Sequence, residues 1–118
     1  MKLQLVGCNH QTAPVELRQQ LAFAAEDLPE AIESLQVRFP KTEAVVLSTC
    51  NRVEVYTASE DQNESPSHED VVQFLADFHQ LSPEKIFGEL FQQSGEDAVR
   101  HLFYVASSLD SMVVGESQ

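Results

Sequence analysis

Apolar residues recur along this chain with two spacings, one of about two residues and one of three to four. The first spacing is typical of strands that bury one face, and the second of helices that bury one side. Strands are predicted at residues 2–10, 43–48, 52–58 and 87–92. Helices are predicted at residues 14–22, 27–39, 69–79 and 94–109.

If the two helices between the first and second strands are counted as one helical connection, the order is strand, helix, two strands, helix, strand and a last helix. This order predicts an α+β fold, a ferredoxin-like split βαβ sandwich in which an antiparallel sheet carries helices on one face, followed by a C-terminal helix. The short break between the second and third strands predicts a hairpin with Cys50 near its turn. Asp27, Pro29 and Glu30 have the pattern of a capping box, which predicts the start of the second helix.

The charge of the chain restricts its partners. With 118 residues it is long enough for one domain with a single core, and its net charge is −12. Such a field repels phosphate backbones, so these residues alone are not expected to bind nucleic acid non-specifically. No apolar run approaches the roughly 18 residues that span a bilayer, and the first residues are too short and too alternating for a secretory signal. A cytoplasmic protein with no membrane segment is therefore expected.

Cys50 is the first candidate for chemistry, because it stands beside an amide and a guanidinium in the polar break between two apolar runs. The cysteine can be a nucleophile, a metal ligand or a small buried side chain. Arg52 can lower the pKa of the thiol, clamp a carboxylate, or simply be a solvated arginine at a strand end. The local sequence leaves these alternatives open.

His101 is the second candidate, either as a general acid or base or as a residue at the edge of a helix. At about 100° per residue it falls roughly 120° from the centre of the apolar stripe of the last helix. That predicted stripe consists of Ala98, Val99, Leu102, Phe103, Ala106 and Leu109.

Metal and dinucleotide sites are disfavoured by spacing. Cys8, His10 and Cys50 could contribute to a zinc site only without the usual paired spacings, because no Cys-x-x-Cys or His-x-x-x-His is present. Cys8 is expected to pack in the core. The chain also has no Gly-x-Gly-x-x-Gly motif and no phosphate loop.

Three blocks of sequence, taken together and in order, resemble the glutamyl-tRNA reductases. They are GCNHQTAPVELR at residues 7–18, LSTCNRVEVY at residues 47–56, and His101 followed by VASSLDSMVVGESQ at residues 105–118. The resemblance covers essentially the whole chain, and the middle block is highly specific.

The resemblance implies a mechanism for the residues already singled out. Cys50 matches a nucleophile that attacks the ester of glutamyl-tRNA and forms a thioester, which NADPH then reduces to glutamate-1-semialdehyde, the first step of tetrapyrrole (porphyrin and heme) biosynthesis. His101 matches a histidine important for activity. Arg52 becomes a candidate for holding the glutamate carboxylate. The full set of matched substrate-binding positions is Thr49, Cys50, Asn51, Arg52, Ser111, Glu116, Ser117 and Gln118.

The resemblance also implies what these residues lack. The chain stops without a cap or a polar tail, so residues 1–118 are expected to be the N-terminal catalytic domain of a longer protein. The NADPH-binding domain and the dimerisation domain would follow, so this part alone is not expected to complete the reduction or to form the homodimer. Glutamate-1-semialdehyde aminomutase is a candidate partner of the full-length enzyme.

Two departures from the family pattern are Ser108 in place of the usual glycine and Ser117 in place of the usual proline. Both are expected to affect only fine geometry. Two other classes of function stay open, a non-catalytic relative that binds a ligand or a protein, and a thioester-forming hydrolase that uses no nicotinamide.

Overall fold

The structure, a computed structural model, describes the backbone of residues 1–116 and the side chains of residues 1–107. The strands are β1 (Lys2–Asn9), β2 (Thr42–Ser48), β3 (Arg52–Ser59) and β4 (Phe91–Ser94). The helices are α1 (Val15–Leu21), α2 (Leu28–Arg38), α3 (His68–His79), α4 (Pro83–Ile86) and α5 (Glu96–Glu116). Short 3₁₀ turns occupy Ala25–Asp27, Gln62–Glu64 and Phe87–Glu89. Among the described residues, none of the helices combines the length and apolarity that a membrane crossing needs.

The four strands form one sheet in the order β2-β3-β1-β4, and all neighbouring strands are antiparallel. β3 is therefore inserted between β1 and β2, the two strands that α1 and α2 connect. This is the arrangement of a split βαβ unit, and it confirms the predicted α+β, ferredoxin-like fold.

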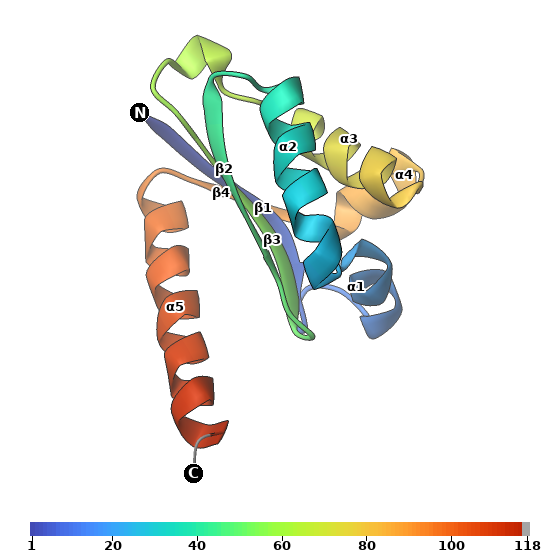
Figure 1. Ribbon diagram of the computed structural model, residues 1–118, viewed down its shortest axis with the longest axis vertical. Helices are drawn as coiled ribbons and strands as arrows, with labels where there is room; N and C mark the ends of the chain where they lie inside the picture. The colour runs from blue at the N-terminus through green and yellow to red at the C-terminus, as the bar shows by residue number, and fades with distance from the viewer. Residues whose placement is uncertain (117–118) are drawn as a thin grey trace.

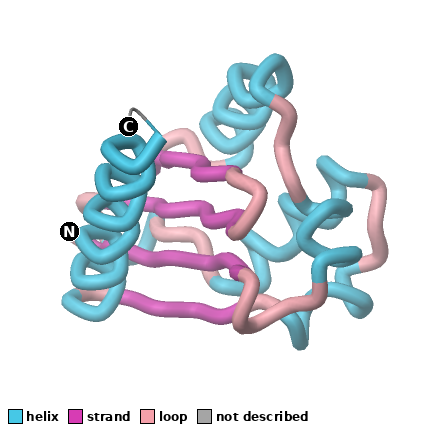
Figure 2. The backbone as a smooth tube through the Cα atoms, turned by 90° about the horizontal axis from the view of Figure 1, so that it is seen from below, coloured by secondary structure: helices cyan, strands magenta, loops and turns pink. Residues whose placement is uncertain are grey.

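The sheet has a helical layer on each side. α2 and α3 cover one face, and α5 runs along the opposite face (Figure 1). Figure 2 shows α5 lying across the strands, apart from the other helices. The main core lies under α2 and α3, where alternate strand residues such as Val6, Cys8, Val53 and Val55 meet Leu35 and Phe74. A smaller apolar cluster of Leu5, Tyr56 and Ala98 lies under α5.

Two of the predicted boundaries were wrong. The fourth strand begins at Phe91 and not at residue 87, because residues 87–89 close a 3₁₀ turn after α4. The last helix begins after Gly95 and continues to Glu116. Gly95 follows the last residue of β4 and has a φ of 60°, which glycine adopts without strain.

The predicted capping box at Asp27 does not form. Asp27 ends a 3₁₀ turn and already has helical backbone angles, and its side chain makes no capping hydrogen bond. An N-cap side chain needs a non-helical backbone to reach back to the helix start. The capping box that does form belongs to α3, where Ser67 and Asp70 bond each other's backbone.

Candidate functional site

The turn between β2 and β3 places Cys50 at the tip of a hairpin, as predicted. The Thr49 backbone N–H donates to the Arg52 carbonyl oxygen at 2.8 Å. The Thr49 hydroxyl oxygen accepts from the backbone N–H groups of Asn51 and Arg52, both at 3.2 Å. Cys50 itself is exposed and is not in a disulfide. A small, tied turn therefore presents the thiol to solvent.

The turn is also anchored from outside. Arg18, on α1, donates through Nη1 to the Cys50 carbonyl oxygen at 2.8 Å and through Nε to the Ala13 carbonyl oxygen at 3.3 Å. Asn9 and Arg52 are register partners at the ends of β1 and β3. The first two sequence blocks, residues 7–18 and 47–56, thus meet at one end of the sheet.

Behind this turn lies a buried carboxylate that the sequence analysis did not single out. Glu54 has no exposed surface and sits on the face of β3 that α5 covers. Its Oε2 atom lies 3.4 Å from Arg52 Nη1 and 2.5 Å from His101 Nε2. Its Oε1 atom accepts from the Tyr56 hydroxyl at 2.8 Å. Burial, with the help of this bond, raises the pKa of Tyr56, so the phenol stays protonated and acts as a donor.

Of the three alternatives left open for Arg52, the solvated strand-end arginine is excluded, because the residue is only 9% exposed. The guanidinium is held at the buried end of the site by the carboxylate of Glu54. That contact engages one of its five N–H donors.

The predicted orientation of the last helix was also wrong. His101 turns toward the sheet, and its side chain is only 15% exposed. Val99, Leu102 and Phe103, expected in the apolar stripe, are 38%, 41% and 69% exposed. The pairing of His101 with Glu54 explains this rotation, since the inward face combines a polar contact with the small buried residue Ala98. Within residues 1–107 no hydrogen bond joins His101 to Cys50.

The structure also bears on the other candidates from the sequence, namely Cys8, a metal site and the matched positions near the C-terminus. Cys8 is fully buried, and this burial raises the pKa of its thiol, which confirms the expected packing role. Within the described part of the chain no three His, Cys, Asp or Glu side chains are grouped so that they could hold a metal ion. The predicted substrate positions Ser111, Glu116, Ser117 and Gln118, and the departure at Ser108, lie outside the residues whose side chains are described.

Known proteins with similar sequences decide the family. A model of the family "Glutamyl-tRNAGlu reductase, N-terminal domain" matches residues 6–118. A glutamyl-tRNA reductase of Neisseria meningitidis serogroup C (strain FAM18) is 48% identical over all 118 residues, and one of Geobacter metallireducens is 45% identical. The chain belongs to the N-terminal domain family of the glutamyl-tRNA reductases. A solved glutamyl-tRNA reductase from Methanopyrus kandleri has a similar fold, with a TM-score of 0.62, 33% identity, and coverage of 96% of this chain and 24% of that one.

The match includes the whole of this chain but only 27% of the length of these reductases. The range matched by the family model, residues 6–118, includes Cys50, Arg52 and His101.

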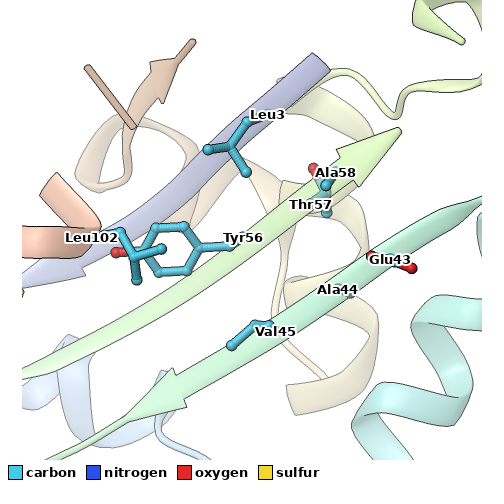
Figure 3. Close-up of a pocket in the computed structure, with 8 residues that line it drawn as sticks. All are labelled: Leu3, Glu43, Ala44, Val45, Tyr56, Thr57, Ala58 and Leu102. Carbon is cyan, nitrogen blue, oxygen red and sulfur yellow. The ribbon is translucent and has the colours of Figure 1, made fainter. Parts of the chain in front are cut away.

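An apolar pocket adjoins the polar cluster around Glu54 through Tyr56 but does not extend to the Cys50 turn. It opens beside α5, between the side chains of Tyr56, Val45 and Leu102 (Figure 3). Neither Cys50 nor Arg52 lines it. The residues that do are Leu3, Glu43, Ala44, Val45, Tyr56, Thr57, Ala58 and Leu102.

Sequence reasoning missed three residues around the Cys50 turn and Arg52, namely Glu54, Arg18 and Gly7. Arg18 and Gly7 lie in the first matched block and Glu54 in the second, but only the β1–β3 register and the α1 contact bring them to Cys50 and Arg52. At position 54 the sequence shows only a charged residue between two valines, which is also the pattern of a strand with one face in water.

Proposed function

We propose that this chain is the catalytic domain of a glutamyl-tRNA reductase, with Cys50 as its nucleophile. The observation that carries the proposal is the exposed Cys50 at the tip of a turn tied by Thr49 and by Arg18. A nucleophile has to reach a large substrate without being displaced, and this turn combines access with a fixed backbone.

The reaction begins with attack of the Cys50 thiolate on the carbonyl carbon of the glutamyl ester. A carbon–sulfur bond forms, the bond between that carbon and the ribose oxygen breaks, and the freed tRNA oxygen takes up one proton. The products are a glutamyl thioester on Cys50 and uncharged tRNA. Because an aminoacyl ester is already activated, positioning of the two reactants is the main contribution required of these residues.

Arg52 is the group best placed to recognise the glutamyl side chain. Its guanidinium is nearly buried and held by Glu54, and the donors that Glu54 does not engage can form a two-pronged contact with a second carboxylate. We propose that this carboxylate is the γ-carboxylate of the substrate. Thr49 and Asn51 complete the turn around the reacting carbonyl.

Reduction of the thioester to glutamate-1-semialdehyde would use a hydride from NADPH. The described residues do not fit that cofactor, since Gly7 lies inside a strand, Gly88 in a 3₁₀ turn and Gly95 alone before α5, so they form no glycine-rich phosphate loop. We therefore derive no step through NADPH from this chain. We propose that the cofactor and dimerisation domains belong to the part of the relatives' length that this chain does not cover.

The test is a full-length reductase that carries this chain, assayed with glutamyl-tRNA and NADPH. The Cys50→Ser variant should lose both the thioester and the production of glutamate-1-semialdehyde. Cys8→Ala removes the buried thiol and serves as the matched control, with turnover expected to remain at temperatures where the variant is folded. Turnover by Cys50→Ser would refute the assignment of the nucleophile.

A further inference from the structure

The Glu54 carboxylate is completely buried and is surrounded by three polar side chains. Arg52, Tyr56 and His101 each reach one of its two oxygen atoms. A buried carboxylate is unfavourable unless charge and hydrogen bonds compensate it, and here both oxygen atoms are engaged. With no solvent-exposed surface, Glu54 is placed to act through its neighbours and not on a substrate.

The backbone next to Glu54 is shaped for this side chain. Gly7 is its register partner on β1, and a Cβ atom built at residue 7 would lie 2.9 Å from the Glu54 Cγ atom. Real Cβ atoms essentially never come that close to another heavy atom. The absence of a side chain at residue 7 therefore gives the glutamate its path across the sheet toward α5.

The hydrogen-bond partners of Glu54 are divided between its two carboxylate oxygen atoms, and this division determines the tautomer of His101. Oε1 takes the Tyr56 hydroxyl, and Oε2 lies between Arg52 Nη1 and His101 Nε2. A carboxylate that accepts from both Tyr56 and Arg52 is an acceptor toward His101 as well, which places the hydrogen on Nε2. The neutral ring is then left with Nδ1 as the nitrogen that can accept or deliver a proton.

We propose that Glu54 is a positioning residue that does two things at once. It holds the Arg52 guanidinium where the substrate carboxylate arrives, and it fixes the His101 tautomer with Nδ1 free for proton transfer. This inference rests on the proposed function of Cys50 and Arg52. A carboxylate that sets the tautomer and orientation of a catalytic histidine is a known device in acyl transfer.

The first measurement needs no variant. The ring nitrogen shifts of His101 in ¹⁵N-histidine-labelled protein, recorded at a pH where the ring is neutral, should show hydrogen on Nε2. A ring with hydrogen on Nδ1 would overturn the proposal, whatever the variants do.

The second measurement uses Glu54→Gln in the full-length reductase. Loss of the fixed tautomer should lower kcat by about a hundredfold, the lower range of what a positioned acid or base contributes. Loss of the Arg52 anchor should raise KM for glutamyl-tRNA by roughly tenfold, a separate effect on substrate binding. In the labelled protein, the same substitution should give a mixture of His101 tautomers.

Gln4→Leu is the matched control for a purely structural effect. Gln4 is 3% exposed, lies on β1, and bonds Ser65 and Pro66 away from the Cys50 turn. This variant should lose stability but keep kcat and KM within about twofold at a temperature where it is folded. If Gln4→Leu changed both constants as Glu54→Gln does, the effect would be general destabilisation and the proposal would be refuted.

Failure of this inference can be told apart from failure of the proposed function. If Cys50→Ser still turns over, the proposed nucleophile is wrong, and the role of Glu54 falls with it. If Cys50→Ser is inactive while Glu54→Gln keeps the kcat and KM of the parent enzyme, only the role of Glu54 is wrong.

Discussion

Gly7 lies directly opposite Glu54 in the pairing of β1 with β3, and a Cβ atom at residue 7 would come within 2.6 Å of the Val53 carbonyl oxygen. Because that oxygen belongs to the backbone, no change of rotamer relieves the contact. We expect Gly7→Ala to lower the free energy of unfolding by about 1–3 kcal/mol, the usual cost of overpacking. Urea denaturation of the 118-residue chain measures this change.

Gly88→Ala provides the control for this prediction. A Cβ atom at Gly88 would meet nothing within 4 Å, and this glycine has no left-handed backbone angle. Its substitution should leave stability unchanged or slightly improved. Equal losses in the two variants would show that close packing at Gly7 is not the cause.

Arg18 gives a second prediction, because it anchors the Cys50 carbonyl oxygen from α1. Arg18→Ala should loosen the hairpin turn and slow thioester formation by roughly tenfold, since misplacement of a reacting group is costly in rate. Hydrogen exchange of the Thr49–Arg52 amides should become faster in the same variant. Single-turnover thioester formation in a full-length reductase and exchange in the isolated chain are the two measurements.

Arg38→Ala separates this effect from the loss of any arginine. Arg38, on α2, forms a partly exposed ion pair with Asp77 of α3 at 2.7 Å, and this pair does not include the turn. Arg38→Ala should lower the free energy of unfolding by no more than about 1 kcal/mol and leave the hydrogen exchange of the Thr49–Arg52 amides unchanged. Faster exchange at Thr49–Arg52 in both variants would contradict a specific role for Arg18.

The hairpin and the faces of its strands were predictable because apolar and polar residues alternate along them with a period of two. Val53 and Val55 point into the main core, and Arg52, Glu54 and Tyr56 point to the other face, as the pattern predicted. Antiparallel sheets commonly leave such a second face in water, so a glutamate there looked unremarkable. Its burial depends on α5, which returns from a distant part of the chain to cover that face.

The orientation of α5 could not be obtained from hydrophobic spacing for the same reason. Leu102 and Phe103 favour one rotation of the helix by hydrophobicity, whereas the bond between His101 and Glu54 requires another. His101 and Glu54 are 47 residues apart in the sequence, so their contact cannot be predicted from the residues around either one. The error at β4 was local, because Phe87 and Leu90 lie three residues apart, a spacing that fits a 3₁₀ turn and not the period of two of a strand.

The two cysteines should differ sharply in reactivity. Cys50 is exposed at the hairpin tip, whereas Cys8 is fully buried and burial raises the pKa of its thiol. In the folded chain, iodoacetamide should modify Cys50 and spare Cys8, because the reagent needs an accessible thiolate. Mass spectrometry of peptides from a time course measures both sites. In urea the two cysteines should react at similar rates, and modification of Cys8 first in the folded chain would contradict the structure.

His79 makes the stability of the domain sensitive to mild acid. Its ring packs 4.6 Å from the ring of Phe23 and 5.4 Å from that of Phe78, and burial lowers the pKa of the imidazole despite its bond to the Leu21 backbone. The unfolded chain therefore binds a proton at a higher pH than the folded one does. This contribution to stability is complete above the ordinary histidine pKa of about 6.5 and is lost as the pH falls from there through the lowered value.

We expect the free energy of unfolding to fall by about 1.4 kcal/mol for each pH unit that separates the ordinary pKa of His79 from its lowered pKa in the folded chain. Urea titrations at pH 7.5 and in steps down to pH 5 measure this slope. His79→Phe removes the titrating group while keeping an aromatic ring against Phe23 and Phe78, so its slope should be shallower. His10→Gln, which removes an exposed histidine, should keep the slope of the parent chain. An unchanged slope in His79→Phe would show that His79 is not the group that couples folding to pH.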